Sequence, residues 1–383
     1  MTHHELLDRA IRDRREAMIE ELRAVVEHET PSLDKVALDG LAHTLAARFE
    51  AMGAETSLIP NTVGGMHVRA AFGTVDGARP TLVLAHYDTV WPLGTIGRMP
   101  FRVEGVKAFG PGVFDMKASL VMITSALDAI QSLGLTLANP VVVLVTSDEE
   151  IGSPRTRVII EDEARASAQT LVMEPPLADG SLKTARKGVG HFHVSIEGRA
   201  SHAGVEPEKG INAIVELARQ ILVIEALANP KLGTTLSTGV ISGGTTSNVV
   251  PAHASAAIDA RVVVMTEEAR IVAAFQSLTP IHPGAKVHAR GDFDRPPMER
   301  SAAVAGLYER IKTIGSTIGL TLGEGSTGGA SDGNFTAAIG VPTVDGLGCP
   351  GGGAHADSEH ILIDGFLERT VLLATLLLNL GPQ

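Results

Sequence analysis

The sequence has little of several residue types that would commit it to particular functions. Its single cysteine, Cys349, excludes an internal disulfide and a thiolate zinc cluster. Lys and Arg total 32 against 44 Asp and Glu, and the resulting net charge of -12 argues against a nucleic acid or an anionic membrane as a partner. The apolar stretch Val371–Leu380 is only about half of the roughly 20 residues that a membrane-spanning helix needs. Any metal site must therefore use His, Asp and Glu side chains.

The rest of the composition is typical of a folded protein with more than one domain. Hydrophobic residues make up 44% and charged residues 20%, which supplies a core and excludes global disorder. At about 150 residues per domain, 383 residues predict two or three domains. The first residues lack the apolar stretch of a secretory signal, so we expect a cytoplasmic protein, or a periplasmic one if a signal peptide has been removed.

Short apolar runs in the first half of the chain predict a parallel sheet. Thr81–Ala85, Pro140–Val145 and Thr170–Met173 have the length and composition of strands that are buried on both faces. A helical pattern, Met116–Leu133, lies between the first two runs. Strand, helix and strand in this order predict a right-handed crossover. The expected fold class is therefore α/β, with a mostly parallel twisted sheet flanked by helices.

Residues 187–294 have a different pattern, which predicts a second domain inserted into the first. The alternation in His191–Ile196 indicates a strand. A helix, two strands, a helix and a last strand are then expected at Ile211–Ala228, Thr234–Ile241, Ala252–Val264, Thr266–Leu278 and near Val287. This β-α-β-β-α-β order is that of a ferredoxin-like α+β unit. We therefore expect residues 1–186 and 295–383 to form one domain and 187–294 to form the insertion.

Polar side chains follow three of the apolar runs at the points where the predicted strands end. They are His86 and Asp88 after the first run, Glu149 and Glu150 after the second, and Glu174 after the third. Any one of them alone would usually be a helix cap or a solvated loop residue. Ligands bind at the carboxyl edge of open α/β sheets, so three successive cases indicate a shared site. Asp115 opens the long helical pattern and His355 follows the glycines 351–353, and both are candidates for the same site.

The residue types in this constellation are those that bind two metal ions. Imidazole and carboxylate ligands together suit zinc, manganese or cobalt. Two ions about 3.5–4 Å apart need a bridging carboxylate and roughly two further protein ligands each. The chain supplies a matching set of candidate ligands in His86, Asp115, Glu150, Glu174 and His355.

Two further acidic residues complete the predicted chemistry. Asp88 is placed to hold the second ring nitrogen of His86, as carboxylates do for many metal-binding histidines. Glu149 remains beside a ligand and could carry a proton from water to a leaving amine. A solvated acidic pair is the commoner interpretation of a Glu-Glu dipeptide, but here an apolar strand directs the pair toward the site.

These motifs resemble those of the dinuclear zinc hydrolases of the aminoacylase, acetylornithine deacetylase and glutamate carboxypeptidase family. The matching segments, in order, are His86–Asp88, Gly112–Lys117, Asp148–Glu150, Glu174-Pro175 and Gly352–His355. Within that family the chain is most similar to the bacterial glutamate carboxypeptidases, which cleave C-terminal glutamate from folates. The resemblance implies a zinc-exopeptidase-like catalytic domain, and it implies that residues 187–294 are a lid that also forms a homodimer.

The resemblance also assigns roles within the catalytic domain. Asp115 would bridge two zinc ions, for which cobalt or manganese could substitute. His86 and Glu174 would bind one ion, and Glu150 and His355 the other. Glu149 would be the general base, and Asp88 would orient His86.

Four residues of the lid and its neighbouring loop gain roles from the same resemblance. His202 would donate a hydrogen bond to the developing oxyanion, in its own or in the partner subunit. Arg261 and Asn248 would hold a substrate carboxylate, and Gly329 would approach the substrate with its backbone. Without the resemblance, His202 would be read as a surface loop histidine and Arg261 as a solvated charge at a strand end.

The predicted function is the metal-dependent hydrolysis of an amide bond in an N-acyl amino acid or before a C-terminal amino acid, by a hydroxide that bridges two ions. An N-acyl-amino-acid deacylase similar to acetylornithine deacetylase, or a dipeptidase, would use the same residues. Different classes are a serine hydrolase that uses Ser331 and a catalytically silent metal-binding protein. Lys183, Arg186 and Lys187 could recognise an acidic substrate side chain, although solvated charges are the commoner interpretation.

Overall fold

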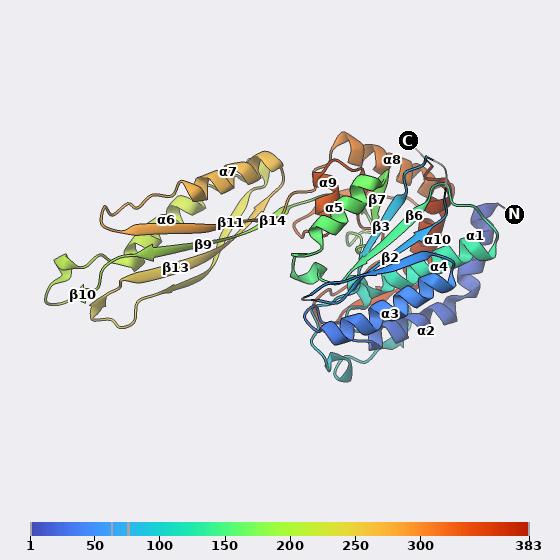
Figure 1. The fold of residues 1–383 in the computed structure, drawn as a ribbon, viewed down its shortest axis with the longest axis horizontal. Helices are drawn as coiled ribbons and strands as arrows, with labels where there is room; N and C mark the ends of the chain where they lie inside the picture. The colour runs from blue at the N-terminus through green and yellow to red at the C-terminus, as the bar shows by residue number, and fades with distance from the viewer. Residues whose placement is uncertain (1, 63, 75–76, 382–383) are drawn as a thin grey trace. The chain divides into compact units, whose positions relative to one another are not determined.

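The computed structural model describes residues 2–62, 64–74 and 77–381, which form two compact units (Figure 1). The first unit contains the chain up to Thr184, Arg300–Thr327 and the chain from Ser331 onward. The second contains Ala185–Glu299 together with Gly328–Ala330. The short segment Gly328–Ala330 thus groups with the second unit although both of its neighbours in sequence group with the first.

A twisted six-stranded sheet forms the centre of the first unit. Its order is β1-β2-β6-β3-β7-β16, in which β6, β3, β7 and β16 are mutually parallel while β2 and β1 pair antiparallel. The strands are β1 (Glu55–Ile59), β2 (His67–Phe72), β3 (Thr81–His86), β6 (Val141–Thr146), β7 (Gln169–Val172) and β16 (Thr343–Val344). The expected α/β class with a mostly parallel sheet is confirmed. The antiparallel pair β1 and β2 was not predicted.

Helices cover both faces of this sheet, and alternate residues of each strand pack against them. In β3, Val83 and Ala85 belong to the larger apolar cluster, whereas Leu82 and Leu84 belong to the smaller cluster on the other face. This two-sided burial explains why the central strands read as unbroken apolar runs. The helices are α1 (His3–Asp13), α2 (Arg15–Glu27), α3 (Lys35–Ala51), α4 (Ala118–Ser132), α5 (Arg157–Ala166), α8 (Ala302–Thr317), α9 (Gly333–Ala338) and α10 (Ile363–Asn379).

Shorter elements connect this framework. A four-stranded sheet of order β17-β18-β5-β4 contains β4 (Arg102–Glu104), β5 (Lys107–Phe109), β17 (Gly351–Gly352) and β18 (His360–Leu362). A two-stranded sheet contains β8 (Leu182–Arg186) and β15 (Glu324–Thr327). Single turns of helix are η1 (Thr95–Gly97), η2 (Val113–Lys117) and η3 (Glu149–Ile151), with η4 (Pro207–Lys209) and η5 (Pro230–Leu232) in the second unit.

The second unit is a four-stranded antiparallel sheet with two helices on one face. Its order is β11-β13-β9-β14, from β9 (Gly188–Glu197), β11 (Thr235–Gly243), β13 (His253–Val262) and β14 (Lys286–Arg295). The helices are α6 (Ala213–Glu225) and α7 (Met265–Gln276), and a small pair joins β10 (Ser201–His202) to β12 (Val249–Val250). The ferredoxin-like expectation is confirmed.

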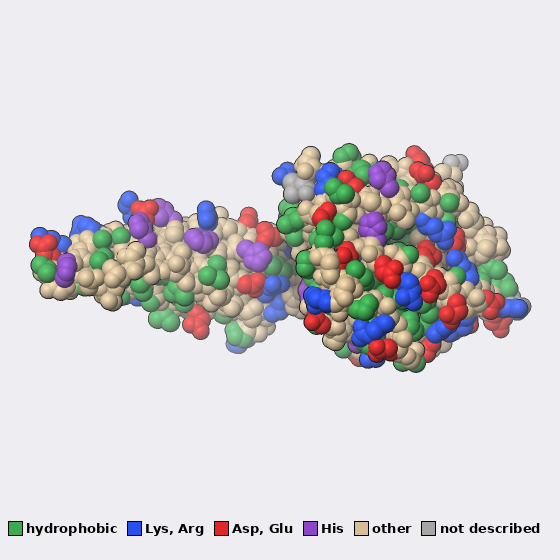
Figure 2. Space-filling model, turned by 90° about the horizontal axis from the view of Figure 1, so that it is seen from below, with side chains coloured by type: hydrophobic (Ala, Val, Ile, Leu, Met, Phe, Trp, Pro, Cys, Tyr) green, Lys and Arg blue, Asp and Glu red, His purple; other side chains and the backbone are tan. Residues whose placement is uncertain are grey.

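The two faces of this second sheet differ in chemistry. Phe192, Val194 and Ile196 of β9 pack with Leu217 and Phe275 of the helices in one apolar cluster. The alternate positions of β9 are His191, His193, Ser195 and Glu197, which are polar. In the view of Figure 2, histidine side chains and both signs of charge are spread over this unit.

None of the helices in the described part of the chain is both long enough and apolar enough to cross a membrane.

A pair of glycine substitutions tests the packing of the first unit. A Cβ at Gly348 would lie 2.3 Å from the carbonyl oxygen of Met173, one residue beyond β7, whereas a Cβ at Gly306 in α8 would meet no atom within 4 Å. Gly348→Ala should therefore lower the free energy of unfolding by about 1–3 kcal/mol or more. Gly306→Ala should raise it by about 0.5–1 kcal/mol, because alanine loses less entropy in a helix. Urea unfolding of both variants checks this, and equal midpoints would contradict it.

Candidate metal centre

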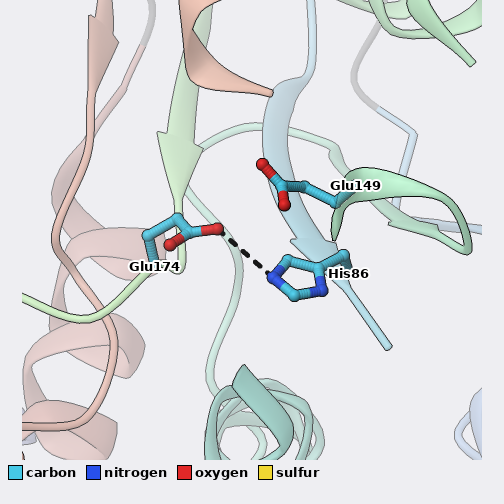
Figure 3. A group of neighbouring side chains, drawn as sticks. All are labelled: His86, Glu149 and Glu174. Atoms are coloured by element: carbon cyan, nitrogen blue, oxygen red, sulfur yellow. Dashed lines mark ion pairs between the residues drawn. The ribbon is translucent and has the colours of Figure 1, made fainter. Parts of the chain in front are cut away.

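The parallel strands deliver four of the predicted site residues to one edge of the sheet. His86 is the last residue of β3, Glu149 and Glu150 begin η3 three residues beyond β6, and Glu174 lies two residues beyond β7. Because β6, β3 and β7 are adjacent and parallel, their carboxyl ends meet. Figure 3 shows the side chains of His86, Glu149 and Glu174 directed toward one another from these elements.

His86 and Asp115 lie at the centre of the group. The Nε2 atom of His86 is 3.4 Å from Oε1 of Glu174 and 3.3 Å from Oδ1 of Asp115. One potential ligand atom from each of His86, Glu149 and Glu174 lies within 4.8 Å of the others, and the same holds for His86, Asp115 and Glu150. Two overlapping groups of ligand atoms thus share His86.

His355 joins the second of these groups from the C-terminal part of the chain. Its Nε2 atom is 3.5 Å from Oδ2 of Asp115 and 3.3 Å from Oε2 of Glu150. Asp115 therefore turns one carboxylate oxygen toward His86 and the other toward His355. This is the arrangement required of a carboxylate that bridges two ions. His355 has a φ of 61°, in the left-handed region, and lies within a turn in which the N–H of Ala356 donates to the carbonyl oxygen of Gly353 at 2.9 Å.

Asp88 has a broader structural role than the sequence suggested. Its carboxylate accepts hydrogen bonds from the backbone N–H groups of Glu149 and Glu150, both at 3.1 Å, and from the Ser32 hydroxyl at 2.7 Å. The Nδ1 atom of His86 is 3.0 Å from the backbone carbonyl oxygen of Asp88 and 3.4 Å from its carboxylate. Asp88 thus fixes the turn that carries Glu149 and Glu150 as well as the ring of His86.

Glu359 supports the site and was missed in the sequence. Its buried carboxylate accepts hydrogen bonds from the backbone N–H groups of Gly112, Phe114 and Asp115 and from the indole of Trp91, at 2.8–3.1 Å. Burial raises the pKa of Glu359, against the effect of these donors. The loop that presents Asp115, whose peptide bond to Met116 is cis, is therefore held by a residue 244 positions away.

The electrostatics of the site favour bound positive charge. Burial raises the pKa of Glu150 to about 7, although His355 opposes the shift. Hydrogen bonds to Asp115 and Glu150 raise the pKa of His355 to about 10. Burial disfavours the charged form of Asp115, but hydrogen bonds from His355 and His86 outweigh it and lower its pKa. Protons on Glu150 and His355 thus balance the charge of the group in the absence of another cation, while Asp115 stays ionised.

A buried oxygen without a hydrogen-bond partner also indicates that this group of residues binds metal ions. The Oε1 atom of Glu150 is buried and has no hydrogen-bond partner among the described residues. A buried acceptor without a partner is costly, and a coordinated cation would satisfy it. His86, Asp115, Glu150, Glu174 and His355 therefore form a site whose geometry and charge suit a pair of cations.

The lid residues singled out in the sequence fall into two groups within the second unit. His202 and Asn248 are neighbours, because the N–H of Ala203 donates to the carbonyl oxygen of Asn248 at 2.9 Å. The Nδ1 atom of His202 accepts a hydrogen bond from the N–H of Gly204 at 3.1 Å, which assigns the proton of the neutral ring to the exposed Nε2. His202 can therefore donate a hydrogen bond from Nε2.

Arg261 lies at the opposite end of β13 from this pair. It is eight residues beyond His253, or about 26 Å along the strand. Its guanidinium forms a bidentate ion pair with Asp259, in which Nε and Nη2 each donate to one carboxylate oxygen at 2.9 Å. Nη1 also donates to the carbonyl oxygen of Gly328 at 3.4 Å. Within one chain, Arg261 and Asn248 are thus too far apart to hold the same carboxylate.

Solvated charges, the commoner interpretation of Lys183, Arg186 and Lys187, do not describe all three residues. Lys183 and Arg186 are buried, and Arg186 donates to the carbonyl oxygens of Gly329 and Ala330 at 3.1 and 3.2 Å. Their burial follows from their position in β8, which no periodicity in the sequence indicated.

The interpretation of Ser331 as a nucleophile has no support in its surroundings. Ser331 is fully buried, and its hydroxyl donates to the carboxylate of Asp345 at 2.6 Å. An activated serine requires a base to accept this proton and access to the substrate.

The pKa shifts predict how metal binding depends on pH. Metal binding must displace the protons held by His355 and Glu150, so apparent metal affinity should rise with pH and be weakest below about pH 7, where both are protonated. Titration calorimetry of zinc in two buffers with different ionisation enthalpies should detect proton release. His355→Asn, which removes one of the protonated groups, should release fewer protons. An affinity that does not change with pH would contradict this account.

Comparisons with known proteins identify the family. Residues 82–379 match the model of peptidase family M20/M25/M40. Carboxypeptidase G2 of Pseudomonas sp. is 30% identical, with 98% of this chain and 92% of that protein covered. Aminopeptidase PepT of Bacillus cereus has the same fold, with a TM-score of 0.81, 21% identity and 95% and 98% coverage. A dinuclear metal-binding peptidase of Bacillus subtilis has a TM-score of 0.69 at 14% identity, with 96% and 99% covered. The chain belongs to peptidase family M20/M25/M40 and is a metal-dependent peptidase or amidohydrolase of that family.

Proposed function

We propose that this protein hydrolyses the amide bond that links an acyl or peptidyl group to a C-terminal amino acid. The observation that carries the proposal is the gathering of His86, Asp115, Glu150, Glu174 and His355 at one sheet edge, with Glu149 beside them. The likeness to carboxypeptidase G2 over nearly the whole chain supports release of the C-terminal residue. Glutamate is the residue that the motif resemblance favours. Deacylation of an N-acyl amino acid and dipeptide hydrolysis are alternatives that use the same residues.

Two zinc ions are the proposed cofactors, and cobalt or manganese could replace them. His86 and Glu174 would hold one ion, Glu150 and His355 the other, and Asp115 would lie between them. When bound, such ions polarise a carbonyl group and lower the pKa of a coordinated water.

Glu149 is the proposed general base. Its carboxylate lies in the group with His86 and Glu174, and the hydrogen bond from its N–H to Asp88 fixes its backbone. From this place it can take the proton of the attacking water and return it to the departing nitrogen. His86, Glu174 and Glu150 are assigned to the ions, which leaves Glu149 for proton transfer.

Replacement of the base is the direct test of this role. Glu149→Gln should bind metal as the wild type does and should lose about 10²–10⁴-fold in kcat, the usual contribution of an acid–base group. The assay uses N-acyl-glutamates, acetylornithine and dipeptides with zinc, cobalt or manganese, and metal content is measured in parallel. Near-normal turnover by Glu149→Gln would reject Glu149 as the base.

Faster hydrolysis of acetylornithine than of acyl-glutamates by the wild type would favour the deacetylase alternative.

We further propose that the second unit forms a homodimer through the free edge of β11. This edge strand contains no charged residue, whereas the opposite edge, β14, contains Lys286, Arg290 and Asp292. Val240 and Ile241 on β11 are 64% and 59% exposed. A long, uncharged and exposed edge strand is suited to pairing with another strand, and pairing with its own copy is the symmetric solution.

Dimerisation would also reconcile the separation of the lid residues. Because His202 and Asn248 lie at the opposite end of β13 from Arg261, one lid could serve two active sites. Arg261 would then act in its own subunit, and His202 with Asn248 in the site of the partner. There the Nε2–H of His202 would donate to the oxyanion.

Mixing two inactive variants tests this arrangement. Glu149→Gln and His202→Ala are each expected to be nearly inactive as homodimers. In a randomly mixed dimer population about a quarter of the wild-type activity should return, because half of the dimers are mixed and each contains one intact site. Analytical ultracentrifugation of Ile241→Lys, expected to be monomeric and inactive, is the control for dimerisation. If His202 acts in its own subunit, the mixture stays inactive.

A further inference from the structure

The segment that carries Glu149 and Glu150 is held by two buried carboxylates, those of Asp88 and Asp332. The segment runs from Thr146, the last residue of β6, to Ser153. In the middle of this segment, the backbone N–H groups of Glu149 and Glu150 donate hydrogen bonds to Asp88. The second carboxylate is that of Asp332, which no motif in the sequence singled out.

Asp332 contacts both ends of the segment with separate oxygens. The hydroxyl of Thr146 donates to Oδ2 of Asp332 at 2.9 Å, and the hydroxyl of Ser153 donates to Oδ1. Thr146 and Ser153 are fully buried and Asp332 is 3% exposed. Water is therefore a poor substitute partner at this place, so the two hydrogen bonds restrict the segment more than exposed ones would.

The backbone at the second contact needs such a restraint. Gly152 and Ser153 have φ values of 91° and 54°, in the left-handed region. For a serine this conformation is costly and persists only where surrounding contacts determine it. Those contacts include the hydroxyl bond to Asp332 and the bond from the N–H of Ser153 to the carbonyl oxygen of Asp148 at 2.8 Å. Losing the Asp332 contact would leave the turn after Glu149 free to relax.

We propose that Asp332 is a positioning residue for Glu149. It ties the end of β6 to the end of the turn and so fixes the direction in which the Glu149 carboxylate projects. This inference rests on the proposed function, since it takes Glu149 to be the base. Asp332 itself touches neither substrate nor ion; it acts through the backbone of residues 146–153.

The place of Asp332 in the chain gives this contact a second consequence. Asp332 follows the segment Gly328–Ala330, whose carbonyl oxygens accept hydrogen bonds from Arg186 and Arg261. The loop on which Gly329 is expected to meet the substrate is thus anchored by two arginines at one end and by Asp332 at the other. The same residue that holds the base also ends the substrate loop.

Substitutions on both sides of the contact test the proposal. Asp332→Asn can accept only one of the two hydroxyl bonds, and Thr146→Val removes one donor with little change in shape. Both should lower kcat about 10–100-fold, as expected when a reacting group is displaced, with KM changed by less than about 3-fold. Thr146→Ser keeps the hydroxyl, so its kcat should stay near the wild-type value. Zinc content and the thermal midpoint are measured for each variant.

Ser331→Ala is the matched control in the same loop. It removes a buried hydroxyl that bonds to Asp345 and does not contact the segment of Glu149, so kcat should change by less than about 3-fold. Unchanged kcat in Asp332→Asn and Thr146→Val would overturn the proposal. The proposal would also be overturned if Thr146→Ser lost as much kcat as Thr146→Val. A fall in kcat that only parallels a loss of zinc or of folded protein would overturn it as well.

A double substitution separates this inference from the proposed function. In the Glu149→Gln background, Asp332→Asn should lower the residual kcat by less than about 2-fold, because its effect passes through Glu149. If the two substitutions act independently, Asp332→Asn should lower the residual kcat by a further 10-fold or more. That result would show that Asp332 acts by another route, and it would overturn the inference while leaving Glu149 as the base. If Glu149→Gln itself is fully active, the proposed base is wrong, whatever Asp332 does.

Discussion

Mutual repulsion among carboxylates is the constraint on which the rest of this structure depends. Asp115, Glu149, Glu150 and Glu174 converge on His86 at one edge of the central sheet. Two like charges about 4 Å apart repel by roughly 4 kcal/mol at the effective dielectric of a protein surface, and more where water is excluded. Such a cluster persists only if positive charge compensates the carboxylates and if the backbone segments that carry them are held in place. The raised pKa values of Glu150 and His355 express the first requirement.

Buried acidic residues behind the site meet the second requirement. Asp88 binds the N–H groups of Glu149 and Glu150, Glu359 binds those of the Asp115 loop, and Asp332 binds the two hydroxyls that flank the turn. Each carboxylate accepts hydrogen bonds from groups that would otherwise be unsatisfied in the interior. The candidate metal ligands are therefore positioned by three surrounding carboxyl groups, which accept their hydrogen bonds from the protein itself.

Local patterns in the sequence could predict the strands and their shared edge, and the structure brings His86, Glu149 and Glu174 together there. Asp115 and His355 do not follow strands of the central sheet, so strand ends did not place them; the start of a helical pattern and a glycine loop marked them as candidates, and the resemblance to known motifs supplied their roles. Glu359 and Asp332 gave no signal because their function is a contact with backbone or hydroxyl groups far away in the chain. The pairing of Arg261 with Asp259 was equally hidden: alternation along β13 puts both on one face but does not say that they bind each other.

Anomalous X-ray scattering from a crystal of the zinc-loaded protein, recorded at the zinc edge, tests the central claim most directly. The account predicts two peaks about 3.5–4 Å apart, with Asp115 between them, His86 and Glu174 on one and Glu150 and His355 on the other. A single peak, or peaks that leave Asp115 without a metal contact, would contradict it.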